Sequence, residues 1–321
     1  MEGYVLHSYG PERYVRNAVA SASTILRYDA ERPIALFCPP EHQAYLEANG
    51  LDTLFSVIAP LPEEHRSIVG FKHHLHHFMP FDRCLFVDSD MIWCRDPEPL
   101  WRQLAGHAFT ATGLARADFF FGGPKGIGVV WDVLLDRRGQ TLRRFGLTHL
   151  PRVQAGMIYS SDSETCRIVC ETAQFFLASR DRTHFRSRLD EGRSEESCEW
   201  SLAMALSRLE LPVVPWLQGY SSPQLDYIGG MTYHDEDYTS VRCEYYSDPF
   251  VYGLRGLRTP WLRNGLIRLI TAIPGRSDKL FVTPFALHFG WLHYKPEYAA
   301  FVDRVWASLV RPERAVISLP Q

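Results

Sequence analysis

Leu85-Phe86-Val87-Asp88-Ser89-Asp90-Met91 is an apolar run that delivers two carboxylates one residue apart. Residues i and i+2 of an extended strand share a face, so Asp88 and Asp90 are expected to point the same way at the end of a strand. Two carboxylates held that close repel each other. A divalent cation such as Mn²⁺ or Mg²⁺ relieves the repulsion, because it takes oxygen ligands and often completes its shell with substrate phosphates. The stretch therefore predicts a site for a metal and a diphosphate, and the alternative is a strand followed by an acidic turn.

Around this stretch, apolar runs alternate with helical patterns. The pattern predicts strands at 4–7, 34–37, 54–58 and 83–87, and helices at 11–27, 41–48 and 67–78. Such alternation is typical of an α/β protein with a mainly parallel sheet that helices cover on both faces. Ligands of open α/β sheets bind beyond the carboxyl ends of the strands, which is where the two carboxylates are expected.

The second half of the chain continues with a mixture of strands and helices. We expect strands at 109–112, 154–160 and 283–288, and helices at 163–178, 195–209 and 296–310. The glycine-rich residues 119–128 lack the Lys-Ser/Thr ending of a P-loop and are expected to form a mobile surface loop. No internal repeat or low-complexity linker interrupts the sequence, which favours one domain over residues 1–321.

Composition narrows the class of protein. The chain has 321 residues, of which 46% are hydrophobic and 22% charged, and its net charge is −3. These values are ordinary for a globular enzyme and give no electrostatic attraction to nucleic acid. The start of the chain lacks the features of a secretory signal, and no apolar run is long enough to span a membrane. Seven cysteines without a C-x-x-C pair indicate free thiols in a reducing compartment, so a cytoplasmic location is expected.

The segment 80–90 resembles the aspartate motif of GT-A-fold glycosyltransferases, in particular the family 8-like enzymes, which are retaining and use nucleotide sugars. Four further matches follow in the expected order. They are a nucleotide-side lysine at Lys72, a sugar-facing strand at Gln154-Ala155-Gly156-Met157, an acidic helix start at Glu199, and a late His/Gly/Lys-Pro segment at His288-Phe289-Gly290 and Lys295-Pro296. The likeness covers most of the chain from Tyr4 to Pro296.

The resemblance implies a GT-A, Rossmann-like fold with a central mainly parallel mixed sheet. It divides the chain into a nucleotide-binding half (1–113), a sugar and acceptor half (114–295) and a C-terminal helix and tail (296–321). It also implies a UDP-hexose donor, with Mn²⁺ or Mg²⁺ held by Asp88, Asp90 and His288 and with Asp90 as the firmer ligand. The residues expected on the nucleotide side are Lys72, Asp88, Ser89, Gly290 and Lys295.

Glycosyl transfer suits such a group of residues, because negative charge accumulates on the departing diphosphate and a bound cation can take it up. Glu199 is the candidate nucleophile or stabiliser of the cationic sugar, and Gln154 is a candidate on the acceptor side. If the enzyme inverts instead, it needs a general base, for which the candidates are Asp235, Glu236 and Asp237.

Two other classes of protein compete with this interpretation. One is a catalytically silent protein that binds a nucleotide sugar, and the less favoured one is a haloacid-dehalogenase-like phosphatase, which also carries an aspartate pair after an apolar strand. The acceptor is left open between a carbohydrate, a lipid-linked molecule, a peptide and a small molecule, and the oligomeric state is not indicated. The basic segment 255–276 predicts either a helical lid over the diphosphate, which we favour, or peripheral contact with an anionic membrane face.

Overall fold

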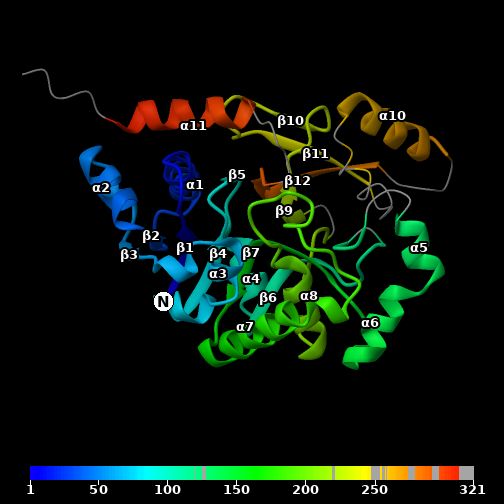
Figure 1. Ribbon diagram of the computed structural model, residues 1–321. Helices are drawn as coiled ribbons and strands as arrows, with labels where there is room; N and C mark the ends of the chain where they lie inside the picture. Colours follow the sequence, from blue (N-terminus) through cyan, green and yellow to red (C-terminus); the bar gives the residue numbers. More distant parts are fainter. Residues whose placement is uncertain are drawn as a thin grey trace, which may run out of the picture.

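In the computed structural model, the described residues are 1–119, 121–124, 128–218, 221–246, 254, 257, 259–273, 279–290 and 296–310 (Figure 1). The helices are α1 (Arg13–Tyr28), α2 (Pro40–Ala48), α3 (Ile68–Lys72), α4 (Glu98–Leu104), α5 (Gly128–Leu134), α6 (Arg137–Phe145), α7 (Ser163–Ala178), α8 (Glu199–Arg208), α10 (Pro260–Thr271) and α11 (Pro296–Leu309). The strands are β1 (Glu2–His7), β2 (Ile34–Cys38), β3 (Val57–Pro60), β4 (Arg83–Val87), β5 (Met91–Trp93), β6 (Phe109–Leu114), β7 (Arg152–Ser160), β8 (Val214–Pro215), β9 (Ser221–Asp226), β10 (Thr232–His234), β11 (Val241–Tyr246) and β12 (Lys279–His288).

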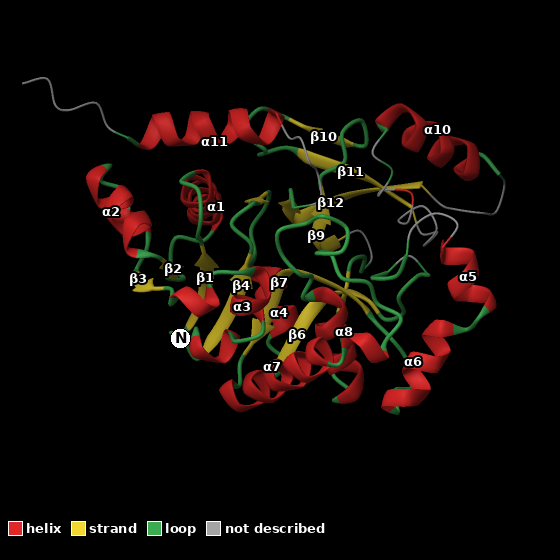
Figure 2. Cartoon of the chain, viewed as in Figure 1, coloured by secondary structure: helices red, strands yellow, loops and turns green. Residues whose placement is uncertain are grey.

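A seven-stranded sheet in the order β3-β2-β1-β4-β7-β6-β8 forms the centre of the molecule. The first four strands in this order run parallel, β7 is antiparallel to both of its neighbours, and β8 is parallel to β6. The predicted α/β class with a mainly parallel mixed sheet is confirmed. Figure 2 shows helices around this sheet. β2 and β7 are buried at every residue, whereas the edge strand β3 is only half-buried.

Alternation along the strands divides the core into two layers. On β1, Val5 packs with α3, α7 and α8, whereas Tyr4 and Leu6 pack with α1, α2 and α4 on the opposite face. This period of two is what an extended strand covered on both faces requires. Apolar side chains on both faces fix the register of β4, and with it the position of Asp88 directly after the strand.

A smaller sheet lies beyond the carboxyl end of β4, in the order β10-β11-β12-β5, and β9 also pairs with β12. We did not predict β9, because its sequence Ser221-Ser222-Pro223-Gln224-Leu225-Asp226 is polar and contains a proline. β9 runs parallel to β12 and places Asp226 opposite His288, and β5 runs antiparallel to β12 and places Met91 opposite the same histidine.

The helix predicted at 67–78 is wrong in its second half, because α3 ends at Lys72. In a continued helix the backbone N–H of His74 would donate to the carbonyl oxygen of Gly70. That oxygen instead lies 2.8 Å from Nδ1 of His74 and 2.9 Å from Nδ1 of His65, and the His74 N–H donates to Phe71. The imidazoles thus take the acceptor that the next helical turn needs, and a short 3₁₀ turn, Leu75–His77, follows.

Two other sequence expectations also need correction. The helix predicted at 195–209 begins only at Glu199, since the Glu195 carboxylate accepts hydrogen bonds from Tyr9 and Ile68 and holds this segment against β1 and α3. The predicted mobile loop at 119–128 contains Phe121, which is 6% exposed and packs in the core, so a free surface loop is wrong at that residue.

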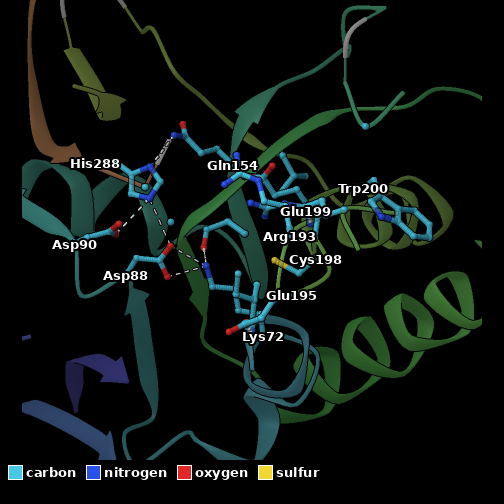
Figure 3. A pocket seen from close by; sticks show the side chains of 18 of the residues that line it. Lys72, Asp88, Asp90, Gln154, Arg193, Glu195, Cys198, Glu199, Trp200 and His288 are labelled. Atoms are coloured by element: carbon cyan, nitrogen blue, oxygen red, sulfur yellow. Dashed lines mark hydrogen bonds and ion pairs between the residues drawn. The ribbon is translucent and has the colours of Figure 1, made fainter. Parts of the chain in front are cut away.

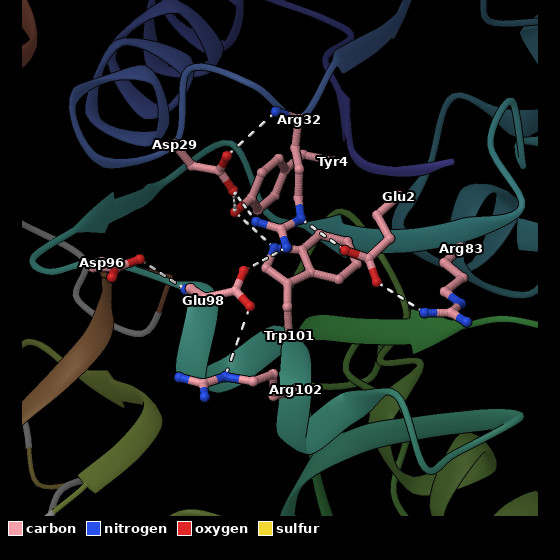
Figure 4. A network of polar contacts seen from close by, with 9 residues as sticks. All are labelled: Glu2, Tyr4, Asp29, Arg32, Arg83, Asp96, Glu98, Trp101 and Arg102. Carbon is pink, nitrogen blue, oxygen red and sulfur yellow. Dashed lines mark hydrogen bonds and ion pairs between the residues drawn. The ribbon is translucent and has the colours of Figure 1, made fainter.

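An ion-pair network joins β1, the end of α1 and the start of α4 (Figure 4). The Arg32 guanidinium donates to Glu2 at 2.8 Å, to Asp29 at 2.9 Å and to Glu98 at 2.6 Å. It also lies over the ring of Trp101, 5.0 Å from the centroid. These contacts are on the face of the sheet that carries α1 and α4, so they support the scaffold and are separate from the carboxylate pair.

Candidate active site

The structure brings Asp88, Asp90 and His288 together just beyond β4. One ligand atom of each residue lies within 4.8 Å of the other two (Figure 3). Nε2 of His288 is 3.6 Å from Oδ2 of Asp88 and 3.5 Å from Oδ1 of Asp90. The three predicted metal ligands therefore converge, although nearly 200 residues separate the histidine from the carboxylates.

Backbone hydrogen bonds explain this convergence. The N–H of Asp88 donates to the carbonyl of Gly156 on β7 at 2.9 Å, which continues the β4–β7 pairing past the end of the strand. The N–H of Phe289 donates to the carbonyl of Asp90 at 3.0 Å, so the end of β12 is tied directly to the second carboxylate. Main-chain hydrogen bonds thus hold both aspartates at the end of β4, next to His288.

Asp226 sets the orientation of the His288 ring. Nδ1 of His288 lies 2.9 Å from Oδ1 of Asp226, and Gln154 donates a hydrogen bond to the same carboxylate oxygen. A carboxylate that accepts from Nδ1–H sets the orientation of the ring, so that Nε2 faces Asp88 and Asp90. We did not identify Asp226 from the sequence, because the strand that carries it has no clear pattern. Its only signal was an acid at the end of a short polar run.

The charges around this group reinforce one another. Burial alone would lower the pKa of His288, but Asp90, Asp226 and Asp88 outweigh that effect and raise the pKa to about 10. Burial alone would raise the pKa of Asp88, but the Lys72 ammonium, with a smaller contribution from His288, holds it well below its usual range. Nζ of Lys72 lies 2.7 Å from Asp88 and 2.8 Å from the carbonyl of Ala155.

This donor set suits a hard divalent cation. The two carboxylates supply oxygen ligands and the imidazole supplies a nitrogen ligand. Mn²⁺ readily binds both kinds of ligand, whereas Mg²⁺ prefers oxygen. The Asp226–His288 hydrogen bond provides the outer support that is usual for a metal-ligating histidine. Asp88, Asp90 and His288, which all line one pocket, would hold the ion.

A pocket of about 450 Å³ opens beside these ligands. Of the residues predicted from the sequence, those that line it are Lys72, Asp88, Ser89, Asp90, Gln154, Glu199, His288 and Gly290. Lys295, the remaining residue predicted on the nucleotide side, lies outside the described residues. One pocket thus collects eight predicted residues from five separate segments of the chain, and their individual roles stay predictions.

Glu199 lies across the pocket from Asp90 and His288, at the start of α8 (Figure 3). Burial raises the pKa of its carboxyl group, although Lys72 and Arg152 act in the opposite direction. Gln154 is 4% exposed and is part of the hydrogen-bond system around Asp226. Its position beside His288 makes it a positioning group as well as a candidate for contact with a sugar.

The candidate bases for an inverting mechanism lie elsewhere. Asp235 accepts hydrogen bonds from Thr239 within the turn between β10 and β11. The carbonyl oxygens of Asp237 and Glu236 accept from Arg27 on α1 and Arg304 on α11. None of the three acids is among the residues that line this pocket.

Gly290 offers a test of the metal group that changes no charge. A Cβ atom at this position would lie 2.5 Å from Cε1 and from Nε2 of His288, so the ring would have to move. We expect Gly290→Ala to weaken Mn²⁺ binding by about 10- to 100-fold, the range typical of lost ligand orientation. Calorimetric titration with MnCl₂ measures the change. Gly106→Ala is the matched control, because no atom lies within 4 Å of the added Cβ; equal affinities in the two variants would contradict the assignment of His288.

Comparison of the sequence with protein-family models and with curated proteins found no match. Among solved structures, the chain is similar to WbbM, described as a bifunctional glycosyltransferase, with a TM-score of 0.50 and 12% identity over 96% of this chain and 50% of that chain. It thus spans about half of WbbM. The galactosyltransferase LgtC in complex with donor and acceptor sugar analogues gives a TM-score of 0.48 with 14% identity over 98% of both chains. GlyE of Streptococcus pneumoniae gives 0.45 with 13% identity over 97% of this chain and 63% of its own. The sheet order, the position of Asp88 and Asp90 beyond β4, and the similarity to WbbM together show that this chain has the GT-A fold.

Proposed function

We propose that this protein is a metal-dependent glycosyltransferase that moves a hexose from a nucleotide sugar, most simply a UDP-hexose, to an acceptor with retention of configuration. The convergence of Asp88, Asp90 and His288 at the mouth of a pocket carries the proposal. The resemblance around the aspartate motif and the GT-A fold support it.

Each part of the site has a place in this chemistry. A divalent ion held by Asp88, Asp90 and His288 would supply Lewis-acid stabilisation of the departing diphosphate. Lys72 holds Asp88 in its ionised form and adds positive charge on the same side of the pocket. Ser89 and Gly290 line the pocket beside these ligands and would contact the nucleotide. Lys295 is proposed for the same side on the sequence resemblance alone.

The opposite side of the pocket would receive the sugar and the acceptor. Glu199, a half-buried acid there, would act as the nucleophile or stabilise the oxocarbenium-like sugar. Gln154 would hold the sugar in place from the β7 side. Retention is tested by following the anomeric configuration of the first-formed product by NMR, and an inverted product would require a general base in place of Glu199 as nucleophile.

The donor assignment is tested with a thermal-shift panel of nucleoside diphosphates and nucleotide sugars, each with and without Mn²⁺. A ligand at about 100 times its Kd stabilises the folded chain by about 2.7 kcal/mol, which corresponds to a rise of several degrees in Tm. We expect the shift with a uridine nucleotide and Mn²⁺ and its loss in EDTA. If no member of the panel raises Tm, the donor assignment is wrong.

An assay of product release, run beside the thermal-shift panel, separates the two competing classes. A silent binding protein would show the thermal shift without ever releasing nucleoside diphosphate from the donor. A phosphatase would release inorganic phosphate from a phosphomonoester and would not need a nucleotide sugar. Release of nucleoside diphosphate that depends on Mn²⁺ and stops in the Asp90→Ala variant supports the transferase.

Three observations bear on the cellular location of the protein and on its contact with a membrane. All seven cysteines are buried free thiols, which supports the proposed cytoplasmic location. Among the described residues, no helix has the length and apolar character needed to cross a membrane. α10 exposes Trp261 and Leu269, at 76% and 67%, and none of its residues lines the pocket, so the described part of the basic segment does not support the predicted lid. Peripheral contact with the inner membrane face stays a prediction.

A further inference from the structure

The segment that leads into α8 contributes arginines to the pocket wall. Arg186 and Arg188 both line the pocket, and they are two positions apart in a stretch that belongs to no helix or strand. Their neighbours Phe185 and Ser187 are buried, with 6% and 2% of their surfaces exposed. Burial therefore alternates along residues 185–188, and the two less buried residues, Arg186 and Arg188, are the ones that line the pocket.

This stretch is anchored on its buried side and along its backbone. The ring of Phe185 stacks on Trp200 of α8, with centroids 4.8 Å apart, and the Ser187 hydroxyl donates to Glu196 at 2.6 Å. The backbone N–H of Arg186 donates to Gly122, and that of Arg188 donates to Glu196. These contacts therefore set the backbone positions of both arginines, and none of them uses an arginine side chain.

The two guanidinium groups differ from the other cations of the pocket. Lys72 is paired with Asp88, and Arg152 is paired with Asp118. Neither Arg186 nor Arg188 has a side-chain hydrogen bond or an ion pair to any described residue. Acids of the same segment have other partners, since Asp190 pairs with Arg180, Glu195 accepts from Tyr9 and Ile68, and Glu196 accepts from Ser187. The chain thus presents two neighbouring arginines to the pocket without an ion pair to a described residue, although the Glu199 carboxylate lies near Arg188.

The position of this segment argues against the donor diphosphate as their ligand. The proposed metal group and Lys72 already provide cations for the donor at the end of β4. In Figure 3, Arg193, Glu199 and Trp200, from the same segment and the start of α8, lie across the pocket from Asp90 and His288. Arg188 lies close enough to Glu199 to lower the pKa of that carboxyl group. The arginine pair therefore belongs to the Glu199 side, where the acceptor is proposed to bind.

We infer that Arg186 and Arg188 form an oxyanion subsite, and that the acceptor carries a phosphate group close to the hydroxyl that receives the sugar. The statement about the acceptor rests on the proposed transferase function, whereas the oxyanion subsite does not depend on it. Planar guanidinium groups match the geometry of phosphate oxygens and bind them through paired N–H donors, which lysine cannot reproduce. A neutral sugar acceptor would leave this charge without a partner.

The first test measures anion binding without metal. In EDTA, with KCl matching the ionic strength, increasing inorganic phosphate is expected to raise the Tm of the native chain. The affinity for phosphate is expected to fall about tenfold for each arginine removed in Arg186→Gln and Arg188→Gln. Arg102→Gln is the control, because its side chain is 71% exposed on α4, outside the pocket. A Tm that does not respond to phosphate, or a response that survives the double variant Arg186→Gln/Arg188→Gln, overturns the subsite.

A second measurement separates this inference from the proposed function. Binding of UDP with Mn²⁺ is expected to be unchanged in the double variant, which also shows that the variant is folded. If the native chain binds phosphate through the arginines but binds no nucleotide, the subsite stands and the transferase proposal fails. If it binds UDP with Mn²⁺ but binds no phosphate, the subsite alone fails.

The source of the phosphate is distinguished by two probes. Glucose 6-phosphate is compared with glucose by thermal shift, and polyprenyl phosphate in phosphatidylcholine vesicles is compared with vesicles of phosphatidylcholine alone by sedimentation. Arginine-dependent preference for the phosphorylated member of the first pair indicates a soluble sugar phosphate, and the same preference in the second pair indicates a lipid-linked acceptor. Absence of preference in both pairs overturns the inference about the acceptor.

Discussion

Replacing Asp90 with Asn is expected to weaken binding of UDP in the presence of Mn²⁺ by about 100-fold or more and to lower donor turnover by about 10²–10³-fold. Asp88 is already engaged by Lys72, so Asp90 supplies the carboxylate with which His288 can complete an ion site. The backbone carbonyl of Asp90 still accepts from Phe289 in the variant, which preserves the local fold.

Calorimetric titration of UDP at fixed Mn²⁺ measures the first effect, and release of nucleoside diphosphate measures the second. Asp181→Asn removes one carboxylate at an exposed position outside the pocket and serves as the matched control. Equal affinities for Asp90→Asn and Asp181→Asn would show that the metal does not bind at the end of β4.

Replacing Lys72 with Met is expected to lower the free energy of unfolding by about 3 kcal/mol or more at pH 7. The lysine and Asp88 side chains are only 9% and 20% exposed, so the substitution leaves a largely buried carboxylate without its main partner. The carbonyl of Ala155 also loses its hydrogen-bond donor. Urea unfolding measures the change, and the double variant Lys72→Met/Asp88→Asn is expected to cost less than the sum of the two single variants.

The pH dependence of this contribution has a defined sign. The pKa of Asp88 is lowered in the folded chain. Its contribution to the free energy of unfolding is therefore fully present above the unfolded-state pKa of about 3.9, and it is lost as the pH falls toward the lowered pKa of the folded chain. The pKa of Lys72 is raised, so its contribution is present below about 10.4 and is lost as pH rises through the raised value. The difference in free energy of unfolding between the native chain and the Lys72→Met variant should therefore be constant from pH 6 to 9.

A surface pair provides the comparison for Lys72. Arg102→Met removes a contact with Glu98 in which the nitrogen and oxygen are 3.7 Å apart and the arginine side chain is 71% exposed. Exposed pairs of this kind contribute about 0–1 kcal/mol. If Lys72→Met costs no more than Arg102→Met, the Lys72–Asp88 pair does not hold the site together.

Much of the fold could be predicted because its signals are local. The strand at 83–87 and the helix at 163–178 have the predicted bounds, since a buried strand and an amphipathic helix each repeat within a few residues. The errors came where side chains compete with the backbone. The imidazoles of His65 and His74 end α3 early by contacting the Gly70 carbonyl oxygen, and the periodicity of a sequence does not predict which carbonyl a histidine side chain will contact.

The sequence by itself determined that Asp88 and Asp90 follow a buried strand on one side of the chain, because strand period and apolar pattern are properties of neighbouring residues. Only the tertiary structure decided that Asp226 orients His288, and that Arg186 and Arg188 share a pocket with them. β9, β12 and the segment before α8 meet β4 through pairing and packing between residues up to about 200 positions apart, and no local pattern encodes such a register. The proposed metal ligands could be named from their chemistry, whereas the groups that orient them and the proposed acceptor subsite required the folded chain.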